Sequence, residues 1–115
     1  MNQTVRQDAG AAWIGVDRQG LIESINSRFT EEFGWTAEAV VGRPLTAIMP
    51  PAFRDAHNLG FARFLQYGRA SILSQPVRLP VLTAGGETVL TETCIEAGRH
   101  EESWRFGATM APVRD

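Results

Sequence analysis

The chain has 115 residues, of which 43% are hydrophobic and 21% are charged, and its formal net charge is −2. This length suits one compact domain, and the composition is that of a globular protein with a core rather than of a disordered chain. No block of Lys and Arg residues stands out, so the charge gives no support for a nucleic-acid or anionic-membrane partner. Cys94 is the single cysteine, which excludes an intramolecular disulfide and a zinc site built from several cysteines.

The first residues, 1–10, are polar and contain no apolar segment of the kind found in secretory signals. Nowhere does the sequence contain a run of roughly 18 apolar residues that could span a bilayer. We therefore expect a cytoplasmic chain without membrane contact, in which residues 1–10 form a lead-in and residues 11–115 form one domain.

Two short apolar segments near the start, residues 11–17 and 21–25, are rich in strand-forming residues. Gly20 lies between them and can take the positive φ of a tight turn, which predicts a β-hairpin. Asn26 or Ser27 is then suited to cap a helix.

Helical signals dominate the middle of the chain. Gly34 is expected to end the first helix, and Thr36 to cap a second one of one or two turns. Residues 45–49 form a third short turn. Pro51 then opens a longer helix that runs to about Gln66, because proline is favoured at the first position of a helix.

Beyond Gly68 the hydrophobic period changes to two, which indicates strands. The first runs from residue 72 to 81, and its two prolines, Pro76 and Pro80, favour an edge or a bulged strand. Residues 84–87 form a hairpin turn. We expect a further strand at 88–97, a polar loop at 98–102 and a last strand at 103–110. The order β-β, helical segment, β-β-β predicts an antiparallel α+β domain.

Several short motifs in this order resemble the PAS domain family. Asn26-Ser27-Arg28-Phe29 followed by Phe33-Gly34-Trp35-Thr36 is similar to the family's N-x-x-F and F-G-Y-S segment. Gly42-Arg43-Pro44-Leu45 resembles its G-x-x-L stretch, and Ile48-Met49-Pro50 its L-M-P opening of the long helix. Thr83 to Glu87 resembles the common hairpin of the family, and Gly107 to Asp115 its terminal G-x-x-R-D. The order and spacing of these motifs carry the resemblance, not any one of them.

The resemblance implies a PAS fold, in which a five-stranded antiparallel sheet has its helices inserted between strands 2 and 3. It further implies a sensory module excised from a larger signalling protein with an output domain. Such a module binds a small ligand or relays a conformational change, and it does no chemistry of its own. The family commonly pairs through an N-terminal cap and the outer sheet face, so we expect a homodimer to which residues 1–12 contribute.

His57 is the sharpest candidate for a binding residue. The segment Arg54-Asp55-Ala56-His57 followed by Arg63 resembles the helix of haem-binding PAS domains in rhizobial oxygen-sensing kinases. That resemblance implies that His57 is the axial iron ligand of a haem b and that Arg63 lies near its propionates. His57 would share an apolar helix stripe with Phe53, Phe61 and Phe64, which suits haem. The alternative is a half-buried core histidine that bonds to a backbone group or a carboxylate.

In the oxygen sensors, an arginine on the next strand contacts the bound gas. Val77 occupies its apparent place here, and Arg78 is one residue away. A one-residue offset points Arg78 to the other face of the sheet unless a bulge intervenes. Cys94 lies on a late strand, outside the helical region where flavin photoreceptors of the family carry their reactive cysteine, and is expected to be a small core residue.

No phosphate-binding glycine loop, H-E-x-x-H or G-x-S-x-G motif is present, so we expect no enzyme activity. His100, in the expected polar loop, is expected to be solvated. Three hypotheses remain: a signalling module that binds a ligand or relays a conformational change, a haem-based gas or redox sensor that uses His57, and a protein-interaction domain with a filled core.

Overall fold

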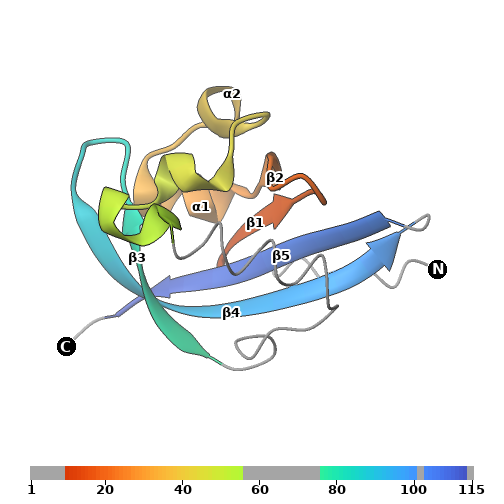
Figure 1. The fold of residues 1–115 in the computed structure, drawn as a ribbon. Coiled ribbons are helices and arrows are strands. Elements are labelled where there is room, and N and C mark those ends of the chain that lie inside the picture. The colour runs from red at the N-terminus through yellow and green to blue at the C-terminus, as the bar shows by residue number, and fades with distance from the viewer. Residues whose placement is uncertain (1–9, 56–75, 101–102, 114–115) are drawn as a thin grey trace.

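The computed structural model describes residues 10–55, 76–100 and 103–113. Five strands form one antiparallel sheet, and short helical pieces lie between β2 and β3 and cover one face of it (Figure 1). The strands are β1 Ala12–Val16, β2 Ile22–Ile25, β3 Val77–Leu82, β4 Thr88–His100 and β5 Ser103–Pro112. The expected α+β class and the insertion of helices after the second strand are confirmed. Within these ranges no helix is long and apolar enough to cross a membrane.

The sheet has the order β2-β1-β5-β4-β3, so the first strand, β1, pairs with the last, β5. Ile14 of β1 lies opposite Ala108 of β5, and Ile95 of β4 also lies opposite Ala108. β3 lies at the edge of the sheet, which is the place that Pro80 favours because proline cannot donate to a neighbouring strand.

The β1–β2 hairpin is held by Asp17, whose carboxylate oxygen Oδ1 accepts from the backbone nitrogens of Gln19 and Leu21 at 2.8 and 3.0 Å. Gly20 takes the predicted positive φ, 85°. On the other side of β2, the Ile22 nitrogen donates to the Arg43 carbonyl at 2.8 Å. The segment between the helices thus pairs with the edge that β2 would otherwise expose.

The helical pieces are short and begin where the capping residues predict. They are α1 Ser27–Phe33, α2 Ala37–Val40 and the 3-10 turns η1 Leu45–Ile48 and η2 Pro51–Phe53. Asn26, not Ser27, caps α1, and Thr36 caps α2. Gly34 ends α1 with a φ of 84°, which a residue with a side chain rarely adopts. Most of the expected long helix lies outside the described residues.

The side-chain amide of Asn26 joins α1 to β1. Its oxygen Oδ1 accepts from the backbone nitrogens of Phe29 at 2.9 Å and of Trp13 at 3.0 Å. Its nitrogen Nδ2 donates to the carbonyl of Ala11 at 2.8 Å. One residue therefore caps a helix and pairs with a strand, which requires the acceptor and the donor of an amide together.

A second set of bonds joins the other end of α1 to the β3–β4 hairpin. The Trp35 indole nitrogen Nε1 donates to the Leu82 carbonyl at 2.7 Å. The Ala84 backbone nitrogen donates to the Phe33 carbonyl at 3.0 Å. The helical segment is thus bonded to β1, near one edge of the sheet, and to the β3–β4 hairpin at the other edge.

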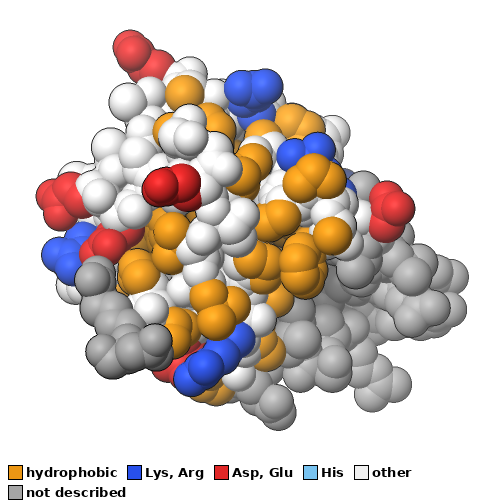
Figure 2. Space-filling view, turned by 90° about the vertical axis from the view of Figure 1, so that its left-hand side faces the viewer, with side chains coloured by type: hydrophobic (Ala, Val, Ile, Leu, Met, Phe, Trp, Pro, Cys, Tyr) orange, Lys and Arg blue, Asp and Glu red, His pale blue; other side chains and the backbone are white. Residues whose placement is uncertain are grey.

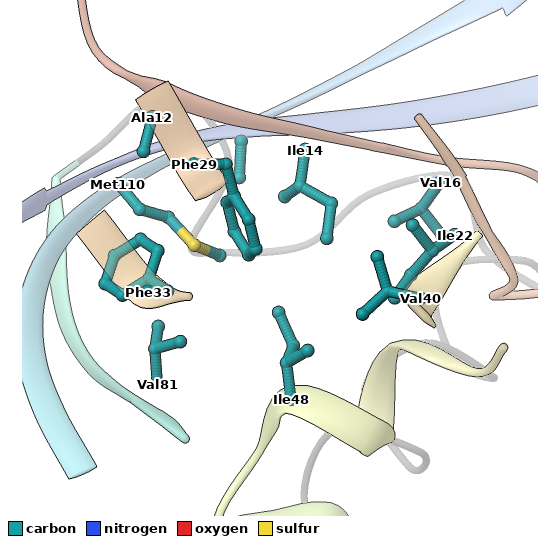
Figure 3. Close-up of a cluster of buried hydrophobic side chains, with 11 residues drawn as sticks. Ala12, Ile14, Val16, Ile22, Phe29, Phe33, Val40, Ile48, Val81 and Met110 are labelled. Carbon is teal, nitrogen blue, oxygen red and sulfur yellow. The ribbon is translucent and has the colours of Figure 1, made fainter. Parts of the chain in front are cut away.

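Hydrophobic side chains fill the space between the sheet and the helical pieces. In Figure 3, side chains from the sheet and from α1 point toward one another, and Ile48 of η1 faces them from the opposite side. The rings of Phe29 and Phe33 are in contact, with centroids 4.9 Å apart. The buried cluster comprises Ala12, Ile14, Val16, Ile22, Phe29, Phe33, Val40, Ile48, Val81, Ala108 and Met110.

Three expectations are wrong. Residues 98–100 belong to β4, and the expected loop shrinks because His100 pairs with Ser103 and a two-residue connection is enough for a hairpin. Phe53, expected on the apolar stripe of the long helix, is 45% exposed at the end of η2. Ala12, expected in the pairing segment, is only 1% exposed, because it lies in the core-facing row of β1.

Candidate functional site

The sheet face that looks toward the helical pieces is the candidate site. Side chains alternate along β4, and Thr91 and Thr93 point to this inner face, where both are fully buried. Thr93 lies opposite Val77 of β3 and Met110 of β5, so it occupies the middle of the face. Among the described residues, these two threonines are the only buried polar or charged ones.

The two hydroxyls form an ordered chain of hydrogen bonds. Thr91 Oγ1 donates to the Leu79 carbonyl at 2.8 Å, and it lies 2.6 Å from Thr93 Oγ1. A hydroxyl has one proton, and a carbonyl can only accept. Because Thr91 uses its proton on Leu79, Thr93 must donate to Thr91. The chain therefore runs from Thr93 through Thr91 to the backbone of the edge strand.

The outer face of the sheet carries the residues between these positions. Arg78 is exposed and lies opposite Glu92, while its neighbour Val77 is half-buried. The pairing of β3 with β4 runs without a register shift from Val77 to Leu82, so no bulge turns Arg78 inward. Cys94, expected in the core, is half-buried and alternates with the two threonines, so it also belongs to the outer face.

The residues proposed for haem are only partly described. His57, Phe61, Arg63 and Phe64 lie outside the described residues, so their roles stay predictions. Of the other three, Phe53 is 45% exposed and Arg78 lies on the outer face, which leaves Val77. Of the three described candidates, only Val77 therefore lies on the inner face of the sheet. Across residues 10–55, 76–100 and 103–113, no group of three or more His, Cys, Asp or Glu side chains is placed to hold a metal ion.

The end of β5 is bonded directly to the strand that carries the threonines. Pro112 lies opposite Thr91. One residue further, the Val113 nitrogen donates to the Leu90 carbonyl at 2.9 Å. Val113, the last described residue, is thus bonded to the residue next to Thr91, whose side chain lies on the inner face.

The sequence analysis assigned no role to Thr91 and Thr93, although alternation along the expected strand at 88–97 puts both on one face. Two threonines two positions apart on a face otherwise made of Val and Ile were the available signal, since buried hydroxyls need partners. Their direct contact and the Leu79 carbonyl depend on the register of β3, which no local pattern reveals.

The direction of the hydroxyl chain predicts unequal costs for its two members. Thr91→Val removes the acceptor for the buried Thr93 proton and should lower the free energy of unfolding by about 1–3 kcal/mol. Thr93→Val leaves the Thr91 bond to Leu79 intact and should cost less than about 1 kcal/mol. The double variant should be more stable than the sum of the two losses predicts. Urea denaturation of the three variants measures this, and a costlier Thr93→Val would contradict the assigned direction.

A sequence relative covers most of the chain. No family model matches the chain. An uncharacterised protein of Azorhizobium caulinodans is 32% identical over 105 residues, which are 90% of this chain and 14% of that protein. The chain therefore spans about one seventh of the length of this relative.

Solved structures match the fold over nearly the whole chain. The PAS domain of an HTR-like protein from Haloarcula marismortui matches with a TM-score of 0.73 and 22% identity, over 92% of this chain and 84% of the other. The PAS domain of the quorum-sensing receptor RpfR from Cronobacter turicensis, in complex with C12:0, matches with a TM-score of 0.64 and 22% identity, over 96% and 100% of the two chains. The predicted arrangement of sheet and helices is the one that these structures share, and the chain is a domain of the PAS fold.

Proposed function

We propose that the chain is a sensory signalling module, which binds a small ligand or relays a conformational change from its interior to the end of β5. The proposed role is non-catalytic and belongs to a larger cytoplasmic protein with an output domain. The observation that carries the proposal is the adjacency of the buried Thr91 to the bond between Val113 and Leu90. The solved PAS domain of RpfR, in complex with C12:0, supports ligand binding by a domain of this fold.

The relay predicts that a change on the inner face reaches the end of β5. Thr91→Val should alter the amide hydrogen exchange of Val113, because Leu90, the acceptor of that amide, adjoins the changed residue. Thr83→Val is the matched control, since the Thr83 hydroxyl accepts from the Glu87 nitrogen in the exposed turn at the other end of the strand pair. Exchange measured by NMR should change at Val113 in the first variant only. An unchanged Val113 in Thr91→Val would refute the relay.

Pairing of two copies is part of the proposed function. Leu90 alternates with the buried Thr91, so it lies on the outer sheet face, where it is 45% exposed. Val41 and Phe53 are exposed to a similar degree, 44% and 45%. Figure 2 shows hydrophobic side chains at the surface of the end of the domain where the β3–β4 hairpin lies. Exposed apolar surface of this kind favours contact with another protein surface.

We expect the full chain to form a homodimer at high concentration and a chain that starts at Ala11 to dimerise more weakly. The shortened chain retains β1, so its fold should persist while residues 1–10 are lost. Light scattering over a concentration series measures the dissociation constant of each form. Leu90→Asp in the full chain tests the sheet face separately, and monomers at every concentration for the unaltered chain would contradict the pairing.

Haem sensing is the alternative that the Arg54-x-x-His57 pattern favours. Arg54 itself has a structural partner, because its Nε donates to the Met49 carbonyl at 3.0 Å. A visible absorption spectrum of protein produced with haem separates this alternative from the ligand-binding or relay module: a Soret band that His57→Ala abolishes and His100→Ala retains would favour haem.

A further inference from the structure

The outer face of β3 and β4 carries two adjacent rows of cross-strand neighbours. In one row, Arg78 lies opposite Glu92, and both side chains are exposed. In the next row, the half-buried Pro80 lies opposite Leu90, which is 45% exposed. This part of the surface therefore combines one positive charge, one negative charge and an apolar row within a few residues of each strand.

The two opposite charges are neighbours that do not pair with each other. Side chains directly opposite each other on antiparallel strands have Cβ atoms about 4.5–5.5 Å apart, so Arg78 and Glu92 are close enough to form an ion pair. Among the described residues, however, neither has an ion-pair partner, whereas Arg105 of β5 pairs with Glu23 of β2. Arg78 and Glu92 are therefore both available to opposite charges on another molecule.

A second copy of the chain carries the complementary surface. A twofold axis in the plane of contact, parallel to the strands and midway between β3 and β4, exchanges the positions that lie opposite each other in the two strands. Arg78 of each copy then meets Glu92 of the other. The same rotation brings Leu90 of each copy against Pro80 of the other. Packed sheets lie about 10 Å apart, a distance that Arg and Glu side chains can bridge from opposite sides.

We propose that the outer face of β3 and β4 is a self-complementary interface between two copies of this chain, in which two Arg78–Glu92 ion pairs form beside the contacts of Leu90 with Pro80. The inference rests on the proposed pairing and gives it a face, a symmetry and a pair of charges. Charge complementarity favours this occupant, because a partner surface of one sign would attract one of the two side chains and repel the other.

Charge reversal in the full chain tests the proposal, because the symmetry predicts which variants associate. Arg78→Glu alone and Glu92→Arg alone each place like charges against each other twice, so each should dimerise about tenfold more weakly than the unaltered chain. An equimolar mixture of the two variants should recover the affinity as a heterodimer, because both opposite-charge contacts form again between the different chains. The double variant should also dimerise. Sedimentation equilibrium gives the dissociation constants, and native mass spectrometry distinguishes the heterodimer from the homodimers.

Arg18→Glu is the matched control, because it changes the net charge by the same amount at an exposed position in the turn between β1 and β2 and should leave the dissociation constant unchanged. Single variants that dimerise as tightly as the unaltered chain, or a mixture that yields no heterodimer, would overturn the inference and leave pairing through another surface intact. An unaltered chain that stays monomeric at every concentration would overturn the inference together with the proposed pairing. Loss of folding cannot imitate the expected result, since unfolded variants would not recover affinity on mixing.

Discussion

The amide of Asn26 is the interaction on which the arrangement of the domain depends. Helices and strands satisfy their own backbone groups, so something else must fix one against the other. Asn26 does this by accepting from the first turn of α1 and from Trp13 of β1 while donating to Ala11, the residue before β1. With Trp35 and Phe33 bonded to the β3–β4 hairpin, the helical segment is held at both sides of the sheet. The apolar core is enclosed because these polar bonds set the spacing of its two walls.

Because the inner face of the sheet is enclosed, polar side chains on it need hydrogen-bond partners within the protein. A hydroxyl is costly to bury without a partner, and within the described residues Thr91 and Thr93 bond to each other and to the Leu79 carbonyl. The same strand is bonded through Leu90 to Val113. The proposed relay therefore spans one residue along β4, with the buried Thr91 side chain on one face and the backbone bond between Val113 and Leu90 in the plane of the sheet.

Much of the fold could be predicted because its signals are local. Gly20 and Gly34 take the positive φ values that their turn and cap positions suggest, and Thr36 begins the helix that it was expected to begin. The end of β4 could not be predicted, because the polar residues 98–100 extend a hairpin whose pairing depends on the partner strand. Phe53 was misplaced for a similar reason, since helical spacing does not reveal which face the core covers. The hydroxyl chain of the candidate site likewise depends on strand register. The position of Arg78 on the outer face, in contrast, could be predicted from the alternation of side chains along a strand.

The contribution of Asn26 to the free energy of unfolding tests this account most directly. Asn26→Ala removes the cap, the bond to Trp13 of β1 and the bond to Ala11 just before it, and it should cost about 3 kcal/mol, at about 1 kcal/mol for each bond. Thr36→Ala removes only the cap of α2 and should cost about 1 kcal/mol. Asn26→Asp keeps the acceptor but loses the donor to Ala11, so it should lie between them. Urea denaturation in this order would support the account, and an Asn26→Ala variant no less stable than Thr36→Ala would contradict it.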